Sequence, residues 1–321
     1  MLITKYILCH GSGNRFLMLD AVAEPQLEQL AEQPQLVAQL CREVGETDGL
    51  LLTVRVGTEF GMRMFNTDGS EAEMCGNGIR CVARQAQPYV GNDVTEFALW
   101  SGGVRHEVCR EEPIHGSIPT YRVAIGVRLA TPDFTPSMGR EGGFIGEVIP
   151  ELDEELRFTY INLGNPHLVA AVEAIDTERL SRLGERVKSL PQILPHGTNV
   201  SLYRPMGGNA IYTATYERGV GLTASCGTAM TASTTAACLC GYCRAGESVE
   251  VYNSGGMVRC CAYEEPTRVT TLSGNATYES VGVIAIDFVQ GSYMEIAPAL
   301  PCFEEQAAYS AFVEDIKNRK S

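Results

Sequence analysis

The sequence predicts an α/β protein built from two similar halves. Short runs rich in Val, Ile, Thr and Tyr, which are typical of strands, alternate with segments of helical periodicity along the 321 residues. A segment that begins with Cys-Gly occurs at Cys75 and again at Cys226, roughly half a chain length further on. Apolar residues make up 45% of the chain and charged residues 20%, the balance of a globular protein with a buried core.

The predicted elements follow one another in order along the chain. Helical periodicity covers residues 24–44, but Pro34 should break or kink that helix because proline lacks the N–H group that a helix interior needs. A second amphipathic helix is expected at 303–318. The runs most typical of strands are 50–56, 121–129, 167–175, 209–217 and 281–288.

Charge and termini exclude several classes of protein. The net charge of -14 and the sequence pI of about 4.9 disfavour binding to nucleic acids or anionic membranes, which need a basic surface. The N-terminus does not resemble a signal peptide, and no apolar run approaches the roughly 20 residues of a membrane span. We therefore expect a cytoplasmic protein whose twelve cysteines are reduced.

The two Cys-Gly segments, EAEMCGNGIRCVAR and LTASCGTAMTASTT, each precede a stretch compatible with a helix. Glycine lets a backbone approach a ligand closely, and the free N–H groups of a helix N-terminus bind carboxylates. Such a terminus should also lower the pKa of a neighbouring thiol. Two elements of this kind could hold a carboxylate between two thiols, one removing an α-proton and the other returning a proton to the opposite face. This chemistry inverts an amino-acid α-carbon.

Five motifs together resemble the diaminopimelate epimerase family. The residues 66–84, NTDGSEAEMCGNGIRCVAR, and 216–229, YERGVGLTASCGTA, resemble its two cysteine signatures. HGSGNRF at 10–16, GNPH at 164–167 and LPHGTNV at 194–200 follow the family's order. The resemblance extends from residue 10 to about residue 286. It implies a cofactor-independent isomerase that interconverts LL- and meso-diaminopimelate in lysine and cell-wall precursor synthesis, without metal, pyridoxal phosphate or nucleotide.

The resemblance also implies an architecture of two pseudo-symmetric domains, each a mixed sheet wrapped around a central helix, with the active site in the cleft between them. Residues 1–130 with 273–321 should form the domain that carries Cys75, and residues 131–272 the domain that carries Cys226. The expected partner is a small amino-acid substrate. The oligomeric state stays open, with a homodimer as one arrangement.

Site residues are carried over by position in these motifs. Cys75 and Cys226 are the predicted acid/base thiols. Backbone amides of four residues after them should hold the α-carboxylate: Gly76, Asn77, Gly227 and Thr228. Asn14 should lie near the reacting centre. The distal head of the substrate, a second carboxylate and ammonium, is assigned to Asn66, Asn165, Asn199, Glu217 and Arg218. Here Arg218 can grip a carboxylate with two hydrogen bonds, and Glu217 can accept from an ammonium.

Three positions depart from the family pattern. Arg15 stands where Asp is usual, Leu222 stands where Glu is usual, and GETDG at 45–49 replaces Gly-Ile-Gly-Ala-Asp. These changes are expected around the reacting centre. Because relatives racemise other amino acids, histidine among them, another amino acid is the alternative substrate. His167, in GNPH, either lines the site or only packs.

Two alternative functions belong to other classes of protein. CLCGYC at 238–243, with Cys260 and Cys261, could bind zinc, but its spacing lacks a second close pair and packed thiols explain it better. Cys75 and Cys226 could instead form a redox couple, in which case oxidation would remove both acid/base groups.

Overall fold

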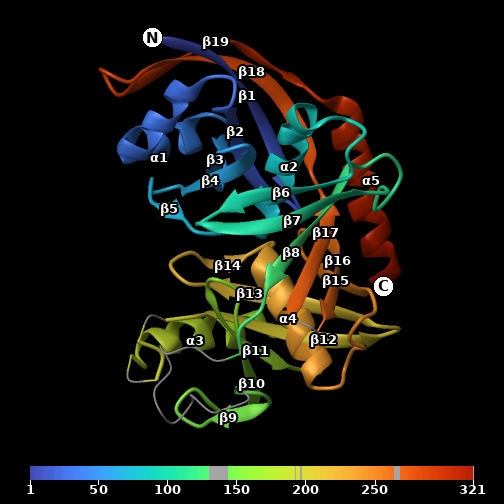
Figure 1. Cartoon of the computed structure of the whole chain (residues 1–321). Helices are drawn as coiled ribbons and strands as arrows, with labels where there is room; N and C mark the ends of the chain where they lie inside the picture. The colour runs from blue at the N-terminus through green and yellow to red at the C-terminus, as the bar shows by residue number, and fades with distance from the viewer. Residues whose placement is uncertain (130–143, 192, 196, 264–267, 321) are drawn as a thin grey trace. The chain divides into compact units, whose positions relative to one another are not determined.

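The computed structural model describes residues 1–129, 144–191, 193–195, 197–263 and 268–320 (Figure 1). Two compact units make up the chain. Unit 1 consists of Met1–Val123 and Ser273–Ser321, and unit 2 of Ala124–Leu272. The domain boundary expected at residue 130 lies outside the described residues, and the assignment of domains stays a prediction.

Unit 1 is a mixed sheet around the helix α2 (Gly76–Val90) (Figure 1). Its strands pair in the order β19-β18-β1-β2-β3-β4-β6-β7-β8, and β2–β3 and β4–β6 are the parallel pairs. The strands of unit 1 are β1 (Leu2–Gly11), β2 (Asn14–Asp20), β3 (Gly49–Val56), β4 (Glu59–Asn66), β5 (Glu71–Ala72), β6 (Glu96–Ser101), β7 (Val104–Glu111), β18 (Thr277–Asp287) and β19 (Ser292–Pro301). Two further strands, β8 (Thr120–Gly126) and β17 (Val269–Asn275), belong partly to each unit. The other helices are η1 (Pro25–Glu32), α1 (Pro34–Glu43) and α5 (Phe303–Lys320).

Unit 2 is a mixed sheet around the helix α4 (Gly227–Leu239), with α3 (Thr177–Lys188) on its outer side. Its strands pair in the order β9-β10-β11-β12-β13-β15-β16, and β11–β12 and β13–β15 are the parallel pairs. The strands are β9 (Glu147–Ile149), β10 (Asp153–Asn162), β11 (Pro166–Ala171), β12 (Asn199–Gly207), β13 (Ala210–Glu217), β14 (Gly221–Thr223), β15 (Val249–Asn253) and β16 (Gly256–Tyr263).

The two units repeat one connectivity. In unit 1 an antiparallel pair, β1 and β2, is followed by a helix, the pair β3 and β4, the short β5, the central helix and the pair β6 and β7. In unit 2 the same places are taken by β10, β11, α3, β12, β13, β14, α4, β15 and β16. The predicted α/β class with two similar halves is confirmed. The repeated Cys-Gly segment is therefore the visible trace of a repeat that spans each unit.

Each central helix begins with a buried stretch in which most side chains are small or apolar. In α2 every residue from Gly76 to Ala83 is buried, and in α4 every residue from Gly227 to Ala237. A second layer covers the other face of each sheet. In unit 1 this layer is η1 and α1, which pack Leu27 and Leu40 against the sheet. The predicted break at Pro34 is confirmed, since η1 ends at Glu32 and α1 begins at Pro34.

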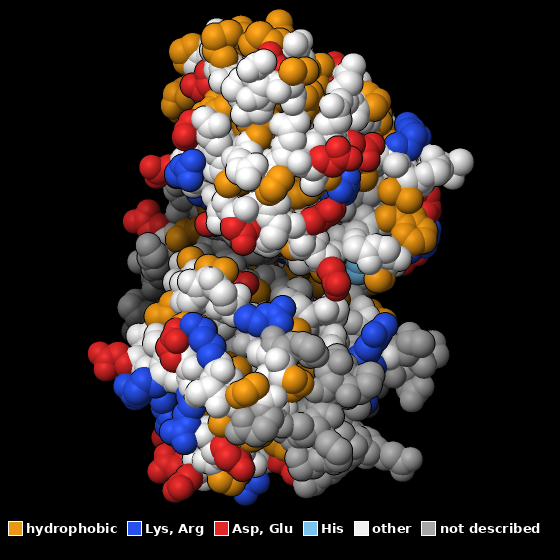
Figure 2. Space-filling model, turned by 90° about the vertical axis from the view of Figure 1, so that its left-hand side faces the viewer, with side chains coloured by type: hydrophobic (Ala, Val, Ile, Leu, Met, Phe, Trp, Pro, Cys, Tyr) orange, Lys and Arg blue, Asp and Glu red, His pale blue; other side chains and the backbone are white. Residues whose placement is uncertain are grey.

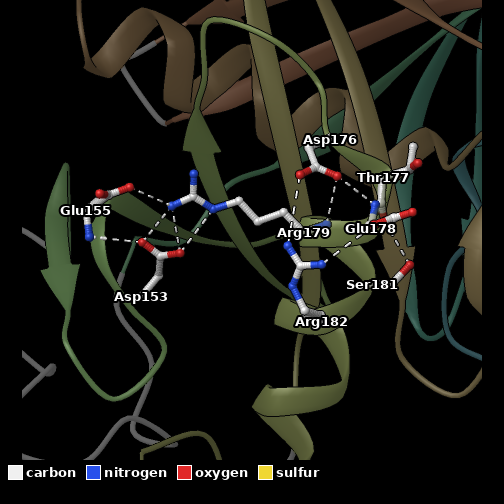
Figure 3. A network of polar contacts seen from close by, with 8 residues as sticks. All are labelled: Asp153, Glu155, Asp176, Thr177, Glu178, Arg179, Ser181 and Arg182. Atoms are coloured by element: carbon white, nitrogen blue, oxygen red, sulfur yellow. Dashed lines mark hydrogen bonds and ion pairs between the residues drawn. The ribbon is translucent and has the colours of Figure 1, made fainter.

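A polar network fixes the start of α3 against β10 (Figure 3). Asp176 caps the helix by accepting from the backbone N–H groups of Glu178 and Arg179. The Arg179 guanidinium then reaches the Asp153 carboxylate at 2.8 Å. The network therefore joins the start of α3, the helix between β11 and β12, to the start of β10.

The surface of unit 1 carries exposed hydrophobic side chains on β1 and β19, the two strands that flank β18. They include Ile3 on β1 and Met294, Ile296 and Leu300 on β19. Figure 2 shows hydrophobic side chains gathered at the top of its view and charged side chains of both signs over the rest. Across the part of the chain that the structure describes, none of the helices combines the length and apolarity of a membrane span.

The C-terminal helix α5 packs against the central helix of unit 1 and against the start of β18. Glu305 accepts from Arg84 of α2, with a shortest distance of 2.6 Å, and from the Tyr278 N–H group. Tyr309 meets the ring of His10 edge-on, with the ring centroids 4.3 Å apart. The helix expected at 303–318 is confirmed, and it packs against other elements of the unit that carries Cys75.

Replacing Glu305 by Ala should lower the free energy of unfolding by about 3 kcal/mol at pH 7, because the mostly buried Arg84 loses its carboxylate partner. Burial raises the pKa of Glu305, but hydrogen bonds from Arg84 and Tyr278 outweigh burial and leave that pKa below its usual value. The stabilisation is therefore present above the ordinary Glu pKa and is lost as pH falls through the folded value.

Urea unfolding of the two variants Glu305→Ala and Glu304→Ala, at pH 7 and at pH 3.5, measures this effect. Glu304 is exposed, so its replacement should cost less than about 0.5 kcal/mol. Equal losses for both variants at pH 7 would contradict the proposed contribution of the ion pair.

Candidate functional site

Cys75 is the N-cap residue of α2. Its backbone is extended, with φ -139° and ψ 108°, and its Sγ accepts from the Gly78 N–H group at 3.3 Å. The end of β1 crosses the start of this helix so closely that a Cβ on Gly11 would lie 2.8 Å from the carbonyl oxygen of Asn77. Glycine at position 11 therefore lets the 10–16 turn lie directly against the helix N-terminus.

Asn14 is the residue of that turn which contacts the thiol. Its Oδ1 lies 3.9 Å from Sγ of Cys75 and accepts from Nδ2 of Asn77 at 3.4 Å. Its own Nδ2 donates to the Asp48 carboxylate at 2.9 Å. The sequence argument missed Asp48, although the residue lies in the GETDG segment that was noted as a departure.

A buried arginine supports this half of the site from within. Arg80 has no exposed surface and donates to the backbone oxygens of Gly76 and Asn275. It also donates to Oδ1 of Asn77 and to the hydroxyl of Ser12, both at 3.1 Å. The guanidinium thus ties the first turn of α2 to two other segments of unit 1. Its place in the motif CGNGIRC was visible in the sequence, but its role was not.

Arg15 does not bring a positive charge to Cys75 through any contact the structure records. Its guanidinium is turned to Glu279 on β18, at 2.7 Å, and to the backbone oxygen of Gly45. Only its backbone N–H joins the site, donating to Asp48 at 2.8 Å. Arg15 therefore lies beside the Cys75 half through its backbone, while its guanidinium is engaged by Glu279 and Gly45.

Asn66 ends β4 beside the same sheet edge. It pairs with Gly49, the residue after Asp48, and its Nδ2 donates to the Ser70 hydroxyl at 3.0 Å. The starts of β2 and β3 and the end of β4 therefore bring Asn14, Asp48 and Asn66 to one edge of the sheet.

Cys226 occupies the N-cap position of α4, as Cys75 does in α2, and its backbone is also extended, with φ -123° and ψ 112°. Its Sγ lies 3.5 Å from Oγ1 of Thr228. Burial raises the pKa of the Cys226 thiol well above its usual value, and the negative charge of Glu217 raises it further. The expectation that the helix N-terminus leaves this thiol with a lowered pKa is wrong for the ligand-free protein, because desolvation and the carboxylate outweigh the helix.

Asn165 and His167, the two polar side chains of GNPH, lie in this half. Oδ1 of Asn165 is 3.1 Å from Nε2 of His167, and its Nδ2 donates to Thr228 at 3.3 Å. His167 is fully buried. Burial lowers its pKa to about 3, and the positive charge of Arg218 adds to that shift, so His167 is neutral at pH 7.

Asn199 and Arg218 are joined through the backbone. Oδ1 of Asn199 accepts from the Arg218 N–H group at 2.9 Å. The Arg218 side chain passes over Gly197, where a Cβ would lie 3.1 Å from Cδ of the arginine. Unit 2 thus gathers Asn165, Asn199, Glu217, Arg218 and Thr228 around Cys226, while Cys75, Asn14, Asn66 and Asn77 belong to unit 1.

The two halves are equivalent by register. Phe16 pairs with Gly49 in unit 1, and His167 pairs with Asn199 in unit 2. Counting from these pairs, Asn14 corresponds to Asn165. Asn66 and Glu217 end the corresponding strands β4 and β13. Each thiol therefore lies at a helix N-terminus beside the same three strand ends.

Leu222, another departure from the family pattern, lines a pocket of about 320 Å³ in unit 2. Cys226, Thr213 and Ile175 also line it. In unit 1 the corresponding position is Glu71, which forms an ion pair with Arg63 at 2.8 Å. Leu222 therefore places an apolar side chain beside Cys226, where the family pattern and the equivalent position of unit 1 have a glutamate.

The cysteines outside the two caps are free thiols, as are Cys75 and Cys226. Over the described ranges, no three His, Cys, Asp or Glu side chains come together in a way that could hold a metal ion. Cys240, from the CLCGYC segment, instead contacts the Thr159 hydroxyl at 3.5 Å.

Comparison with known proteins identifies the family. The family model described as diaminopimelate epimerase matches residues 6–117 and 159–279. A diaminopimelate epimerase from Clostridium acetobutylicum is 34% identical over 285 residues, which are 87% of this chain and 85% of the relative. One from Listeria welshimeri is 32% identical over 330 residues, 99% of this chain and 98% of the relative.

Solved structures share the fold at low sequence identity. A Bacillus anthracis phenazine biosynthesis protein of the PhzF family matches with TM-score 0.64 and 13% identity, over 89% of this chain and 100% of that chain. A hydroxyproline epimerase from Agrobacterium vitis matches with TM-score 0.61 and 14% identity, over 90% of this chain and 94% of that chain. With the sequence matches and the two equivalent cysteine caps, the chain belongs to the diaminopimelate epimerase family.

Proposed function

We propose that this protein epimerises LL-diaminopimelate to meso-diaminopimelate, with Cys75 and Cys226 as the two acid/base groups. The observation that carries the proposal is the pair of thiols at the N-termini of two buried, topologically equivalent helices. In the proposed reaction one thiolate removes the α-proton, and the other thiol donates a proton to the opposite face of the carbanion. The two-base mechanism requires both thiols to reach the same α-carbon.

The α-carboxylate is proposed to bind the first-turn amides of both helices, those of Gly76, Asn77, Gly227 and Thr228. The first N–H groups of an α-helix have no partner within the helix, and the helix dipole favours an anion at that end. Negative charge that spreads from the carbanion onto the carboxylate would be stabilised by the same groups. The burial of both helix starts supports this, since hydrogen bonds to charge strengthen where water is excluded.

The distal head of the substrate is assigned to five side chains: Asn66, Asn165, Asn199, Glu217 and Arg218. Arg218 is proposed to bind the distal carboxylate and Glu217 the distal ammonium. Glu217 also lies close enough to Cys226 to raise its pKa. Pairing of Glu217 with the ammonium of a bound substrate would weaken that effect, so substrate binding would favour the Cys226 thiolate.

Replacing either thiol should remove turnover. Cys75→Ala and Cys226→Ala should each lower kcat by at least about 100-fold, because each removes one of the two proton-transfer groups. Incubation with LL-diaminopimelate in heavy water, followed by mass spectrometry and chiral separation, measures α-deuteration and product together. Cys261→Ser, a half-buried thiol on β16, is the matched control and should retain activity. Native turnover by Cys75→Ala would overturn the two-base mechanism.

Removing the proposed partner of the distal carboxylate, Arg218, tests the choice of substrate. Arg218→Met should raise KM for diaminopimelate by about 10- to 100-fold, because a hydrogen-bonded charge pair to the substrate is lost. L-histidine, the substrate of the alternative racemase, should incorporate no deuterium with the wild-type protein. Deuterium in histidine but not in diaminopimelate would contradict the assigned substrate and leave the thiol chemistry standing.

A further inference from the structure

Two side-chain amides occupy equivalent places beside the two thiols, yet they are turned in opposite directions. In unit 1, Asn14 presents Oδ1 to Sγ of Cys75 at 3.9 Å. In unit 2, Asn165 presents Nδ2 to the Thr228 hydroxyl at 3.3 Å, and that hydroxyl lies 3.5 Å from Sγ of Cys226. The fold alone does not explain this difference, because the strand register of the two units is the same.

The neighbour that turns Asn14 is Asp48. One oxygen of that carboxylate, Oδ2, accepts from Nδ2 of Asn14 at 2.9 Å and from the Arg15 N–H group at 2.8 Å. An ionised carboxylate can only accept hydrogen bonds, so the amide nitrogen must face it and the amide oxygen must face Cys75. At the corresponding amide of unit 2, Oδ1 of Asn165 is instead 3.1 Å from Nε2 of His167.

The guanidinium of Arg80 fixes the same orientation of Asn14, acting through the side chain of Asn77. Nδ2 of Asn77 donates to Oδ1 of Asn14 at 3.4 Å, and Oδ1 of Asn77 accepts from the buried Arg80 at 3.1 Å. A guanidinium can only donate hydrogen bonds. The chain of contacts from Arg80 through Asn77 and Asn14 to Asp48 therefore has one allowed orientation for each amide.

We propose that Asp48 is a positioning residue for Cys75: its carboxylate holds Asn14 with Oδ1 toward the thiol, so that the ligand-free protein presents Cys75 with a hydrogen-bond acceptor. An acceptor favours the S–H form of Cys75, whereas a donor in its place would favour the thiolate. The catalytic meaning of this orientation rests on the proposed function. The orientation itself does not, and it can be measured without substrate.

The test uses the ligand-free, full-length protein and three variants. Asp48→Ala removes the acceptor, and Asp48→Asn removes the charge but keeps an oxygen that can accept from Asn14 and Arg15. Asp287→Ala is the matched control, since Asp287 also accepts from two backbone N–H groups of unit 1 but ends β18, where the chain turns toward β19. Asp48 is exposed, so neither substitution leaves a cavity.

The first readout is the alkylation rate of Cys75 by iodoacetamide at pH 7.5, measured by peptide mass spectrometry with Cys226 as internal reference. In Asp48→Ala the freed amide can turn Nδ2 toward Sγ and stabilise the thiolate, so the rate at Cys75 should rise at least fivefold. The rate at Cys226 should stay within twofold. Asp48→Asn and Asp287→Ala should both match the wild type within twofold.

The proposal is overturned if Asp48→Ala leaves the rate at Cys75 unchanged, or if Asp48→Asn reacts as fast as Asp48→Ala. A rise in Asp287→Ala, or an equal rise at both thiols, would indicate general loosening and would also overturn it. Circular dichroism melting curves of all variants verify that each is folded.

Turnover of diaminopimelate is the second readout. Asp48→Ala should lower kcat about tenfold with KM within twofold of wild type, and Asp48→Asn should restore kcat. If the alkylation pattern appears but the wild type does not turn over diaminopimelate, the positioning role stands and the proposed function fails. If turnover occurs and the alkylation rates do not change, the positioning role fails alone.

Discussion

The candidate site depends on the burial of two helix N-termini, those of α2 and α4, inside the sheets that surround them. The first amides of α2 and α4 have no partner inside their helices, and both starts are buried, so these donors must be satisfied by a side chain, water or a ligand. A cysteine at the N-cap position satisfies these N–H groups poorly, because sulfur is a weak hydrogen-bond acceptor. The sheet wrapped around each helix thus keeps a set of donors available to an anion, with a thiol beside them.

Burial also affects the protonation state of these thiols, because removal from water disfavours the charged thiolate. Burial and the adjacent Glu217 carboxylate raise the pKa of Cys226, although this thiol also lies at a helix N-terminus, which by itself lowers the pKa of a thiol. An amino-acid substrate supplies positive charge as well as negative. In the proposed reaction, pairing of the substrate ammonium with Glu217 lowers the pKa of Cys226, which links binding of a zwitterion to proton transfer by this thiol.

Much of this was readable in the sequence because it is local. The Cys-Gly helix starts and the break at Pro34 each depend on neighbouring residues, and the structure has both where they were expected. The supports of the site are not local. Arg80 contacts Asn275, and Arg15 turns to Glu279, across most of the chain length. No periodicity records such contacts, and a charged residue in a motif does not reveal which way its side chain points.

The pseudo-symmetry of the fold separates two properties of the site, the position of each amide and the direction in which it faces. Duplicated strand ends deliver an amide to each thiol, so the positions of Asn14 and Asn165 follow from topology. Their directions follow from single residues that the repeat does not share, a carboxylate in one half and a neutral imidazole in the other. The repeated fold supplies the matching positions of the two amides, and the unrepeated polar residues behind them supply the difference in the direction that each amide faces.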